Sequence, residues 1–301
     1  MLLIAALAAS VLAWAGAFVV IRGVGPFLDP GALSLGRLVV GTVALGILLL
    51  VRRRWVPPTR REWLQLVLFG VAWFAVYNLA LNAAELTLDA GTASVIVNIG
   101  PIFIALGAGV LLGEGFPRWV VIGTLVAFAG VVLIGVGSVL AQEDAHPLDI
   151  LGALLALAAA ATYAIGVLAQ KPVVARIPAI QATFLGCVIG MLACLPWAGA
   201  LISQLADAPV SAWLGVLYLG VIATAVAFST WGFALKHLPA SQVGISTYLV
   251  PPIATLMGFL AFREVPHPVA LVGGVICLIG VALSRRKPVV REQVAAGARA
   301  D

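Results

Sequence analysis

Long apolar runs separated by short polar breaks dominate the sequence, and none of the runs alternates strictly between apolar and polar residues. A helix needs about 20 apolar residues to cross roughly 30 Å of hydrocarbon, whereas a transmembrane β-barrel shows segments of about 10 alternating residues. The pattern therefore predicts membrane-spanning helices. Ten of them are expected, at residues 2–21, 32–51, 63–83, 91–112, 119–139, 149–170, 180–200, 212–235, 240–262 and 268–284.

The composition agrees with this pattern and excludes a soluble globular domain. Of the 301 residues, 63% are hydrophobic and only 10% are charged, whereas charged residues make up roughly a quarter of a typical soluble protein. We expect an all-α polytopic membrane protein whose surroundings are the lipid bilayer.

The basic residues are concentrated in alternate loops, mainly those that follow the even-numbered runs. Basic loops stay on the cytoplasmic side of a membrane, so both termini are expected in the cytoplasm, with residues 285–301 as a basic tail. The formal net charge of +5 is thus a signal of orientation and does not indicate nucleic-acid binding. The basic residues assigned to the cytoplasmic side are Arg52, Arg53, Arg54, Arg60, Arg61, Arg118, Lys171, Arg176, Lys236, Arg285, Arg286, Lys287, Arg291 and Arg299.

A constant shift of 150 residues relates the two halves of the sequence. It separates Pro101 from Pro251 (251 − 101 = 150) and Glu114 from Glu264 (264 − 114 = 150). The same shift aligns the third to fifth runs with the eighth to tenth runs without a gap. The sequence therefore contains an internal repeat.

The repeat is expected to have inverted topology. Each half holds five runs, an odd number, so the second half enters the membrane from the opposite side. We expect two five-helix repeats, residues 1–140 and 149–284, around a central cavity. Secondary transporters are commonly built in this way, with the substrate site near the membrane midplane, although a duplicated membrane protein need not transport anything.

Polar and aromatic side chains within the runs mark a candidate substrate site. Polar groups are costly in hydrocarbon, so those in mid-span are expected to face the protein interior or a water-filled cavity. Aromatic walls with hydrogen-bonding groups suit a small polar zwitterion or an aromatic solute better than a bare ion. The expected substrate-binding residues are Trp14, Arg37, Trp73, Tyr77, Asn78, Asn82, Ser94, Asn98, Tyr163, Ser229, Thr230, Trp231 and Tyr248.

Several of these residues have a structural alternative. An Asn within a membrane helix can simply tie two helices together. Arg37 lies about two turns into the second run with no carboxylate near it in sequence. Its long stem could carry the charge to the membrane interface, or its guanidinium could bind a substrate carboxylate.

Two prolines and two glutamates are candidate hinge or gating residues. Pro101 and Pro251 each remove a backbone donor and are expected to kink their helices, which would free carbonyl groups for a ligand or provide a hinge. Packing alone is the alternative. Glu114 and Glu264 end their helices with a basic residue near each, so each could form a gating salt bridge or merely terminate a helix.

The residues absent from the spans also narrow the function. Every Asp, Glu and His lies near a span end, in a loop or in a tail, and the sequence has no HExxH motif. We expect no enzyme activity, no metal and no cofactor, and facilitated diffusion or exchange of a small-molecule substrate rather than tight proton antiport.

Taken together, these features resemble the EamA family of the drug/metabolite transporter superfamily, over almost the whole chain. The resemblance rests on the ten-run inverted repeat, the arginine in SLGRLVVG, and a proline, Gly-Glu and glycine signature that ends each half. The signature residues are Pro101, Gly113, Glu114, Gly123 and Gly130, then Pro251, Glu264, Gly273 and Gly280.

The resemblance implies a carrier of the bacterial inner membrane that exports small metabolites, most like the YddG-type amino-acid exporters. Neutral or aromatic amino acids are the expected substrates. The alternative is a proton-coupled exporter of drugs or other metabolites. Arg263 stands where the signature has Gly, and the seventh run lacks the arginine that many members carry. The oligomeric state stays open, and a monomer is compatible with the sequence.

Overall fold

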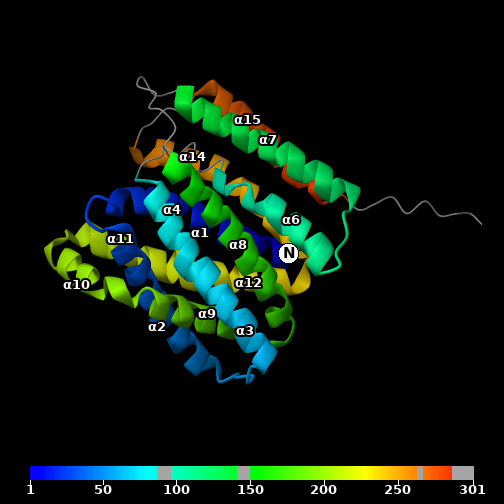
Figure 1. Ribbon diagram of the computed structural model, residues 1–301. Helices are drawn as coiled ribbons and strands as arrows, with labels where there is room; N and C mark the ends of the chain where they lie inside the picture. Colours follow the sequence, from blue (N-terminus) through cyan, green and yellow to red (C-terminus); the bar gives the residue numbers. More distant parts are fainter. Residues whose placement is uncertain (87–95, 141–149, 263–266, 287–301) are drawn as a thin grey trace, which may run out of the picture.

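The protein is described from a computed structural model (Figure 1) that covers residues 1–86, 96–140, 150–262 and 267–286. Within these segments every regular element is a helix and there is no strand. Seven helices are long and apolar enough to span a membrane. The protein is therefore an all-helical, multi-pass membrane protein.

The first half of the chain, up to the gap after residue 140, contains six α-helices and one π-helical segment among its described residues. They are α1 (Leu2–Val24), α2 (Pro30–Arg52), α3 (Arg60–Phe69), the π-helical η1 (Gly70–Val76), α4 (Tyr77–Ala84), α6 (Gly100–Leu111) and α7 (Arg118–Leu140).

The second half follows a similar order of long and interrupted helices. Its described elements are α8 (Ile150–Arg176), α9 (Ala179–Ala193), the 3-10 turn η2 (Leu195–Trp197), α10 (Ala198–Asp207), α11 (Val210–Gly220), the π-helical η3 (Val221–Val226), α12 (Ala227–His237), α13 (Ala240–Ile245), the 3-10 turn η4 (Ser246–Leu249), α14 (Val250–Phe262) and α15 (Pro268–Ser284).

Local sequence signals set several helix ends. Asp29 caps α2 by accepting a hydrogen bond from the Ala32 amide at 2.8 Å, with Pro30 at the first helical position, where proline is pre-organised and loses no hydrogen bond. Thr59 and Glu62 form a reciprocal capping box at the start of α3. At the other end of α2, Arg53 closes the helix in the left-handed conformation, with φ of 48°.

The expected seventh span, residues 180–200, is not one straight helix. α9 ends at Ala193, and the chain bends by 58° through η2 into α10. Pro196 lies in η2, where its missing amide donor is incompatible with continuing α9. If this bent pair is one span, the count by length and composition rises to eight.

Two further expected spans are represented by shorter apolar helices. α6 and α15 have 12 and 17 residues, and residues 87–95, which include the start of the expected fourth span, lie outside the described residues. Ten full-length spans are thus not reached within the described part of the chain.

Both candidate hinge prolines lie in the first turn of a helix rather than inside one. Pro101 is the second residue of α6, which follows a turn at residues 98–99, and Pro251 is the second residue of α14, which follows η4. Proline is tolerated in a first turn because the amide it lacks would be unpaired there anyway. Pro101 thus follows an interruption of the helix, whereas Pro251 follows a 3-10 segment within a continuous candidate span, Ala240–Ala261.

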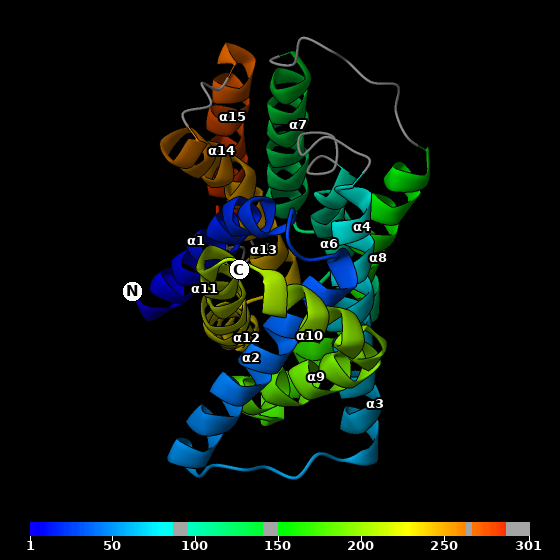
Figure 2. The ribbon, with the colours of Figure 1, turned by 90° about the vertical axis from the view of Figure 1, so that its left-hand side faces the viewer.

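α7 and α15 lie side by side at one end of the molecule (Figures 1 and 2). A β-carbon on Gly123 would lie 2.6 Å from the Gly280 carbonyl oxygen, and one on Gly130 would lie 2.6 Å from the Gly273 carbonyl oxygen. These distances allow only glycine, and the small residues let the two backbones approach closely. Because residue numbers rise along one helix as they fall along the other, the pair is antiparallel.

The largest hydrophobic core lies where α8, α9, α12 and η1 meet. Its members include the fully buried side chains of Phe69, Phe74, Ile177 and Trp231. Two glycines permit this packing: a β-carbon on Gly186 would lie 2.6 Å from the Phe69 ring, and one on Gly166 would lie 2.6 Å from the Trp73 β-carbon. This core surrounds the residues considered next.

Candidate functional site

A cluster of aromatic side chains from four separate elements occupies the centre of this core. Trp14 of α1 lies 5.0 Å from Trp231 of α12, and Trp73 of η1 lies 5.0 Å from Tyr163 of α8, measured between ring centroids. Phe228 joins them at 4.8 Å from Trp73. The rings are tilted or edge-on to one another, which is the arrangement that aromatic pairs prefer. We call Trp14, Trp73, Tyr163, Phe228 and Trp231 the aromatic cluster.

Tyr77 extends this cluster along α4. Its ring centroid lies 6.1 Å from that of Tyr163, and both Trp14 and Tyr77 remain partly exposed. The indole nitrogen of Trp14 donates to the Ala223 carbonyl at 3.1 Å. Five residues expected at the substrate site, Trp14, Trp73, Tyr77, Tyr163 and Trp231, thus lie together.

Arg37 is buried beside the π-helical segments and is held by two uncharged side chains. Its Nη1 donates to Asn78 Oδ1 at 2.9 Å, and its Nε donates to Thr224 Oγ1 at 3.3 Å. Only 7% of its surface is exposed, so the Arg37 side chain does not extend to the membrane interface. No carboxylate among the described residues pairs with it.

Both partners of Arg37 are anchored to backbone carbonyls: Asn78 to carbonyls of η1, and Thr224, which lies in η3, to a carbonyl near the end of α11. Asn78 donates from Nδ2 to the carbonyl oxygens of Trp73 and Phe74, at 3.2 and 2.8 Å. Thr224 donates to the Leu219 carbonyl at 2.8 Å. Asn78 follows η1 with only Tyr77 between them and Thr224 lies within η3, and π-helical segments often occur at functional sites. The arginine is therefore positioned from both halves of the chain.

Asn82 connects α4 to α2. Its Nδ2 donates to Ser34 Oγ at 3.1 Å and to the Pro30 carbonyl at 3.2 Å. Its Oδ1 is buried with no hydrogen-bond partner among the described residues. The amide thus ties two helices together, as the structural alternative expects, and leaves one acceptor unused.

Four further expected residues lie around the aromatic cluster rather than in it. Tyr248 is fully buried in η4, next to α7 and α15, and its hydroxyl has no partner among the described residues. The neighbouring Thr247 lies 3.4 Å from the Tyr163 hydroxyl. Thr230 lies 2.8 Å from Ser10 Oγ, whereas the buried Ser229 hydroxyl has no partner in the described segments. Asn98 lies in the turn before α6 and is half-buried.

Two expected residues cannot be placed. Ser94 and Glu264 lie outside the described residues.

Glu114 binds the start of α13. Its carboxylate accepts hydrogen bonds from the Ser241 amide at 3.1 Å and from Ser241 Oγ at 2.7 Å, and also from the Ala240 amide. The basic residue near it in sequence, Arg118, instead lies over the Trp119 ring, 5.4 Å from the ring centroid. Glu114 therefore connects the end of α6 to α13 and does not pair with Arg118.

Lys171 of α8 binds the end of α12, the helix that precedes α13. Its Nζ donates to the carbonyl oxygens of Leu235 and Leu238, both at 2.6 Å. These carbonyls belong to the last turn of α12 and the residue that follows it, where backbone acceptors lack helical partners. We call the segment Leu238–Pro239 and these two side chains, Glu114 and Lys171, the α12–α13 latch.

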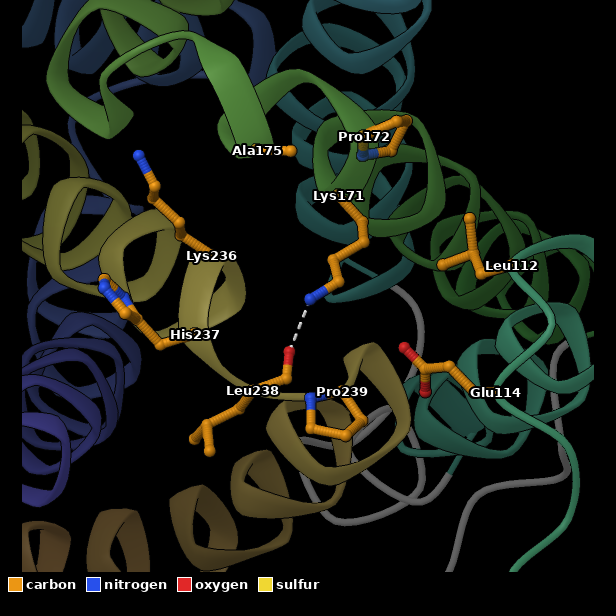
Figure 3. A pocket seen from close by; sticks show the side chains of 9 residues that line it. All are labelled: Leu112, Glu114, Lys171, Pro172, Ala175, Lys236, His237, Leu238 and Pro239. Carbon is orange, nitrogen blue, oxygen red and sulfur yellow. Dashed lines mark hydrogen bonds between the residues drawn. The ribbon is translucent and has the colours of Figure 1, made fainter.

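A hollow of about 450 Å³ opens at this latch (Figure 3). The Lys171 side chain points toward the Leu238 carbonyl, and the Glu114 carboxylate lies near Pro239. One carboxylate, two ammonium groups and one imidazole line it. The lining residues are Leu112, Glu114, Lys171, Pro172, Ala175, Lys236, His237, Leu238 and Pro239.

Four residues at these sites were not anticipated from the sequence: Phe228, Thr224, Lys171 and Gln170. Gln170 is fully buried on α8, and both of its side-chain polar atoms lack partners in the described part of the chain. The internal repeat does not mark Thr224, since the 150-residue shift places it opposite Phe74 (224 − 74 = 150), which is not an expected site residue. No group of three or more His, Cys, Asp or Glu residues suited to a metal ion occurs among the described residues.

Comparison with known proteins identifies relatives along nearly the whole chain. The model of the EamA-like transporter family matches residues 1–136 and 150–286. A Streptantibioticus cattleyicolor protein named "Probable terminal-alkyne amino-acid exporter" is 35% identical over 96% of this chain and 95% of its own length. The Bacillus subtilis "Uncharacterized transporter YdfC" is 31% identical over 91% of this chain and 88% of its own length.

A solved structure has the same fold. It aligns with a TM-score of 0.74 at 21% identity and covers 93% of this chain and 95% of its own. At that identity the likeness concerns the fold alone.

Proposed function

This chain belongs to the EamA-like transporter family, and from that premise we propose that it exports amino acids, neutral or aromatic ones, across the bacterial inner membrane. The name of the Streptantibioticus cattleyicolor relative supports this substrate class. The proposed mechanism is alternating access, by facilitated diffusion or exchange.

The observation that carries the proposal is the buried charge of Arg37. A buried cation without an anion is costly, and the described partners of this guanidinium, Asn78 and Thr224, are both uncharged. None of the hydrogen bonds between described residues uses its Nη2. A substrate carboxylate supplies the missing charge, and the planar guanidinium is suited to bind it through two parallel hydrogen bonds.

The aromatic cluster complements this carboxylate site. Apolar and aromatic walls with a few fixed polar groups are the usual composition of a small-molecule site. Trp14 and Tyr77 are the partly exposed members of this region, so they are the groups that meet a substrate side chain first. This arrangement favours amino acids whose side chains are uncharged.

The α12–α13 latch provides an element that can open. Glu114 and Lys171 come from elements of the two proposed repeats, and both hold the short break between α12 and α13. With both termini in the cytoplasm, the basic hollow beside the latch faces the cytoplasm. Release of these hydrogen bonds would separate α12 from α13 and open the cytoplasmic side, while the outer side closes by the equivalent movement of the other repeat.

Counterflow in proteoliposomes tests the proposal. Vesicles are loaded with one unlabelled amino acid at a time, a trace of the labelled form is added outside, and its accumulation is followed without any ion gradient. Accumulation of neutral or aromatic amino acids is expected. Its absence for the whole panel would refute the proposal, and transport of drugs or other metabolites driven by a proton gradient would then support the alternative.

A variant pair connects this transport to the carboxylate site. Arg37→Gln is expected to lower counterflow at least tenfold, because the carboxylate loses its partner. Arg60→Gln removes an exposed arginine at the start of α3 and is expected to leave transport unchanged. In the wild-type protein, amines that lack a carboxylate should compete poorly with the labelled amino acid for transport. Amines that compete as well as amino acids do would contradict the role of Arg37.

A further inference from the structure

We propose that Gln170 is a second substrate-binding residue, which holds the zwitterionic head group of the amino acid between the aromatic cluster and the hollow at the α12–α13 latch. The inference rests on the proposed transport of amino acids and adds a specificity-determining residue on α8.

Gln170 is a buried amide without partners. Its exposed fraction is 0%, and neither Oε1 nor Nε2 has a hydrogen-bond partner among the described residues. Buried side-chain amides in native proteins are almost always hydrogen-bonded, because leaving one unpaired forfeits its hydration. An exception calls for a group that binds there during the functional cycle.

The position of Gln170 on α8 places it between the two sites already described. One turn earlier, Gly166 packs against Trp73 of the aromatic cluster. The next residue, Lys171, lines the hollow. Gln170 thus lies on α8 between a residue that packs against the aromatic cluster and a residue that lines the hollow.

The facing helix, α12, leaves room for the amide and adds a donor. A β-carbon on Gly232 would lie 3.3 Å from Gln170 Nε2, so any larger residue there would crowd the carboxamide. The adjacent Trp231 is fully buried, and its Nε1 also lacks a partner within the described segments. Three unpaired polar atoms therefore lie on two helices that pack against each other.

The chemistry of these atoms matches an amino-acid head group. Gln170 Nε2 and Trp231 Nε1 are donors suited to a carboxylate, and Gln170 Oε1 is an acceptor suited to an ammonium group. Neither side chain is charged, so binding here is weaker than at Arg37. A transport pathway needs such intermediate sites, which bind a solute and still release it.

The experiment compares two buried glutamines that differ in their hydrogen bonds. Gln181 is buried like Gln170, but its amide donates to the Val56 carbonyl at 2.6 Å and accepts from the Val56 amide at 2.9 Å. Each is replaced by Leu in the full-length protein. Thermal unfolding in detergent and counterflow are measured, with the labelled amino acid that the wild type transports best.

Opposite responses are expected. Gln170→Leu should keep or raise the unfolding temperature, since it removes an unpaired amide, and should raise KM for counterflow at least tenfold. Gln181→Leu should lower the unfolding temperature and leave the KM of the folded fraction unchanged. Gln170→Asn keeps the amide on a shorter side chain and should give an intermediate KM.

Each remaining outcome is also decisive. Wild-type KM in Gln170→Leu would overturn the inference and leave the proposed function intact. A lower unfolding temperature with unchanged KM would assign Gln170 a structural role and overturn it as well. If Gln170→Leu does not fold, Gln170→Met and Gln170→Asn give the same comparison. Absence of counterflow in the wild type would overturn the proposed function, and the inference with it.

Discussion

At the scale of single residues, the orientation of Arg37 on α2 depends on two separate side-chain hydrogen bonds. Each of them can be removed by a single substitution. Arg37 binds Asn78 and Thr224, and each of these is held in turn by a backbone carbonyl, Phe74 of η1 for Asn78 and Leu219 of α11 for Thr224. Arg37 is thus oriented before any substrate binds.

Thr224→Val should weaken this arrangement. Valine has nearly the shape of threonine but no hydroxyl, so Arg37 Nε would lose its acceptor. We expect a loss of about 1.5–3 kcal/mol in the free energy of unfolding, the range for hydrogen bonds to charged groups, together with a higher KM for counterflow. An SDS titration monitored by circular dichroism measures the stability.

Thr162→Val is the matched control. The Thr162 hydroxyl donates only to carbonyls of its own helix, Ala158 and Ala159, so this variant should lose less than about 1 kcal/mol and keep its KM. Equal effects of the two substitutions would contradict the special role of Thr224.

At the scale of elements, close helix–helix contacts and short breaks between helices have different expected roles. α7 and α15 pack through glycines, so their contact is rigid. The α12–α13 junction is instead held by two polar side chains and lies beside a hollow. We expect the first to govern stability and the second to govern opening.

Gly130→Ala should destabilise the α7–α15 pair. Its β-carbon would lie 2.6 Å from the Gly273 carbonyl oxygen and from the Cys277 amide nitrogen, so the helices must separate, at a cost of about 1–3 kcal/mol for overpacking. Thermal unfolding in detergent checks this.

Gly258→Ala provides the comparison on α14. A β-carbon there meets nothing within 4 Å, and alanine is the better helix former by about 1 kcal/mol. This variant should be unchanged or slightly stabilised. A Gly130→Ala protein as stable as Gly258→Ala would show that the α7–α15 contact is not tight.

Glu114→Ala should loosen the α12–α13 latch. The Ala240 and Ser241 amides would lose their acceptor, so the closed arrangement becomes less favourable and the hollow opens more often. A cysteine at Ala175, which lines the hollow, should then react several-fold faster with a membrane-impermeant thiol reagent.

Glu62→Ala tests whether the loss of any interfacial carboxylate has the same effect. Glu62 caps α3 and pairs with Arg176 outside the hollow, so the labelling of Ala175→Cys should stay at its original rate. If Glu114→Ala also leaves this rate unchanged, Glu114 is not part of a latch.

At the scale of the whole molecule, several contacts follow the 150-residue shift. The π-helical residues 71–76 correspond to 221–226. Gly123 contacts Gly280 and Gly130 contacts Gly273, so each glycine touches the counterpart of the other (273 − 123 = 150; 280 − 130 = 150). Reciprocal contacts of this kind are expected where two similar units are related by a two-fold axis, and they support the proposed inverted repeat.

The orientation of the chain can be measured directly. A cysteine at Arg54, between α2 and α3, should be labelled only from the cytoplasmic side, and one at Asp207, the last residue of α10, only from the outer side. Both positions are exposed. The reverse pattern would invert the proposed orientation, and labelling of both from one side would contradict the inverted repeat.

The sequence predicted a helix well where one uninterrupted apolar run determines its bounds. The first run, residues 2–21, became α1, Leu2–Val24, since the length of an apolar stretch is a local property. The seventh run, residues 180–200, became a bent pair of helices because it contains Pro196, and the direction of the bend depends on how α9 and α10 each pack against α2. In the site, the sequence anticipated most of the aromatic cluster but could not reveal which polar atoms would be left unpaired.

The amino-acid sequence by itself determined that this is a multi-pass helical membrane protein with an internal repeat and an arginine within its second span. The length of hydrophobic runs, the distribution of charge between loops and the spacing of the repeated residues depend only on the order of residues in the sequence. The tertiary structure alone decided that Arg37 meets Asn78 and Thr224, 41 and 187 residues away, and that Glu114 holds α13, 126 residues away. It also decided that Gln170 has no hydrogen-bond partner among the residues the structure describes. Hydrogen bonds are directional and short-ranged, so these contacts depend on the packing of helices that are distant in sequence.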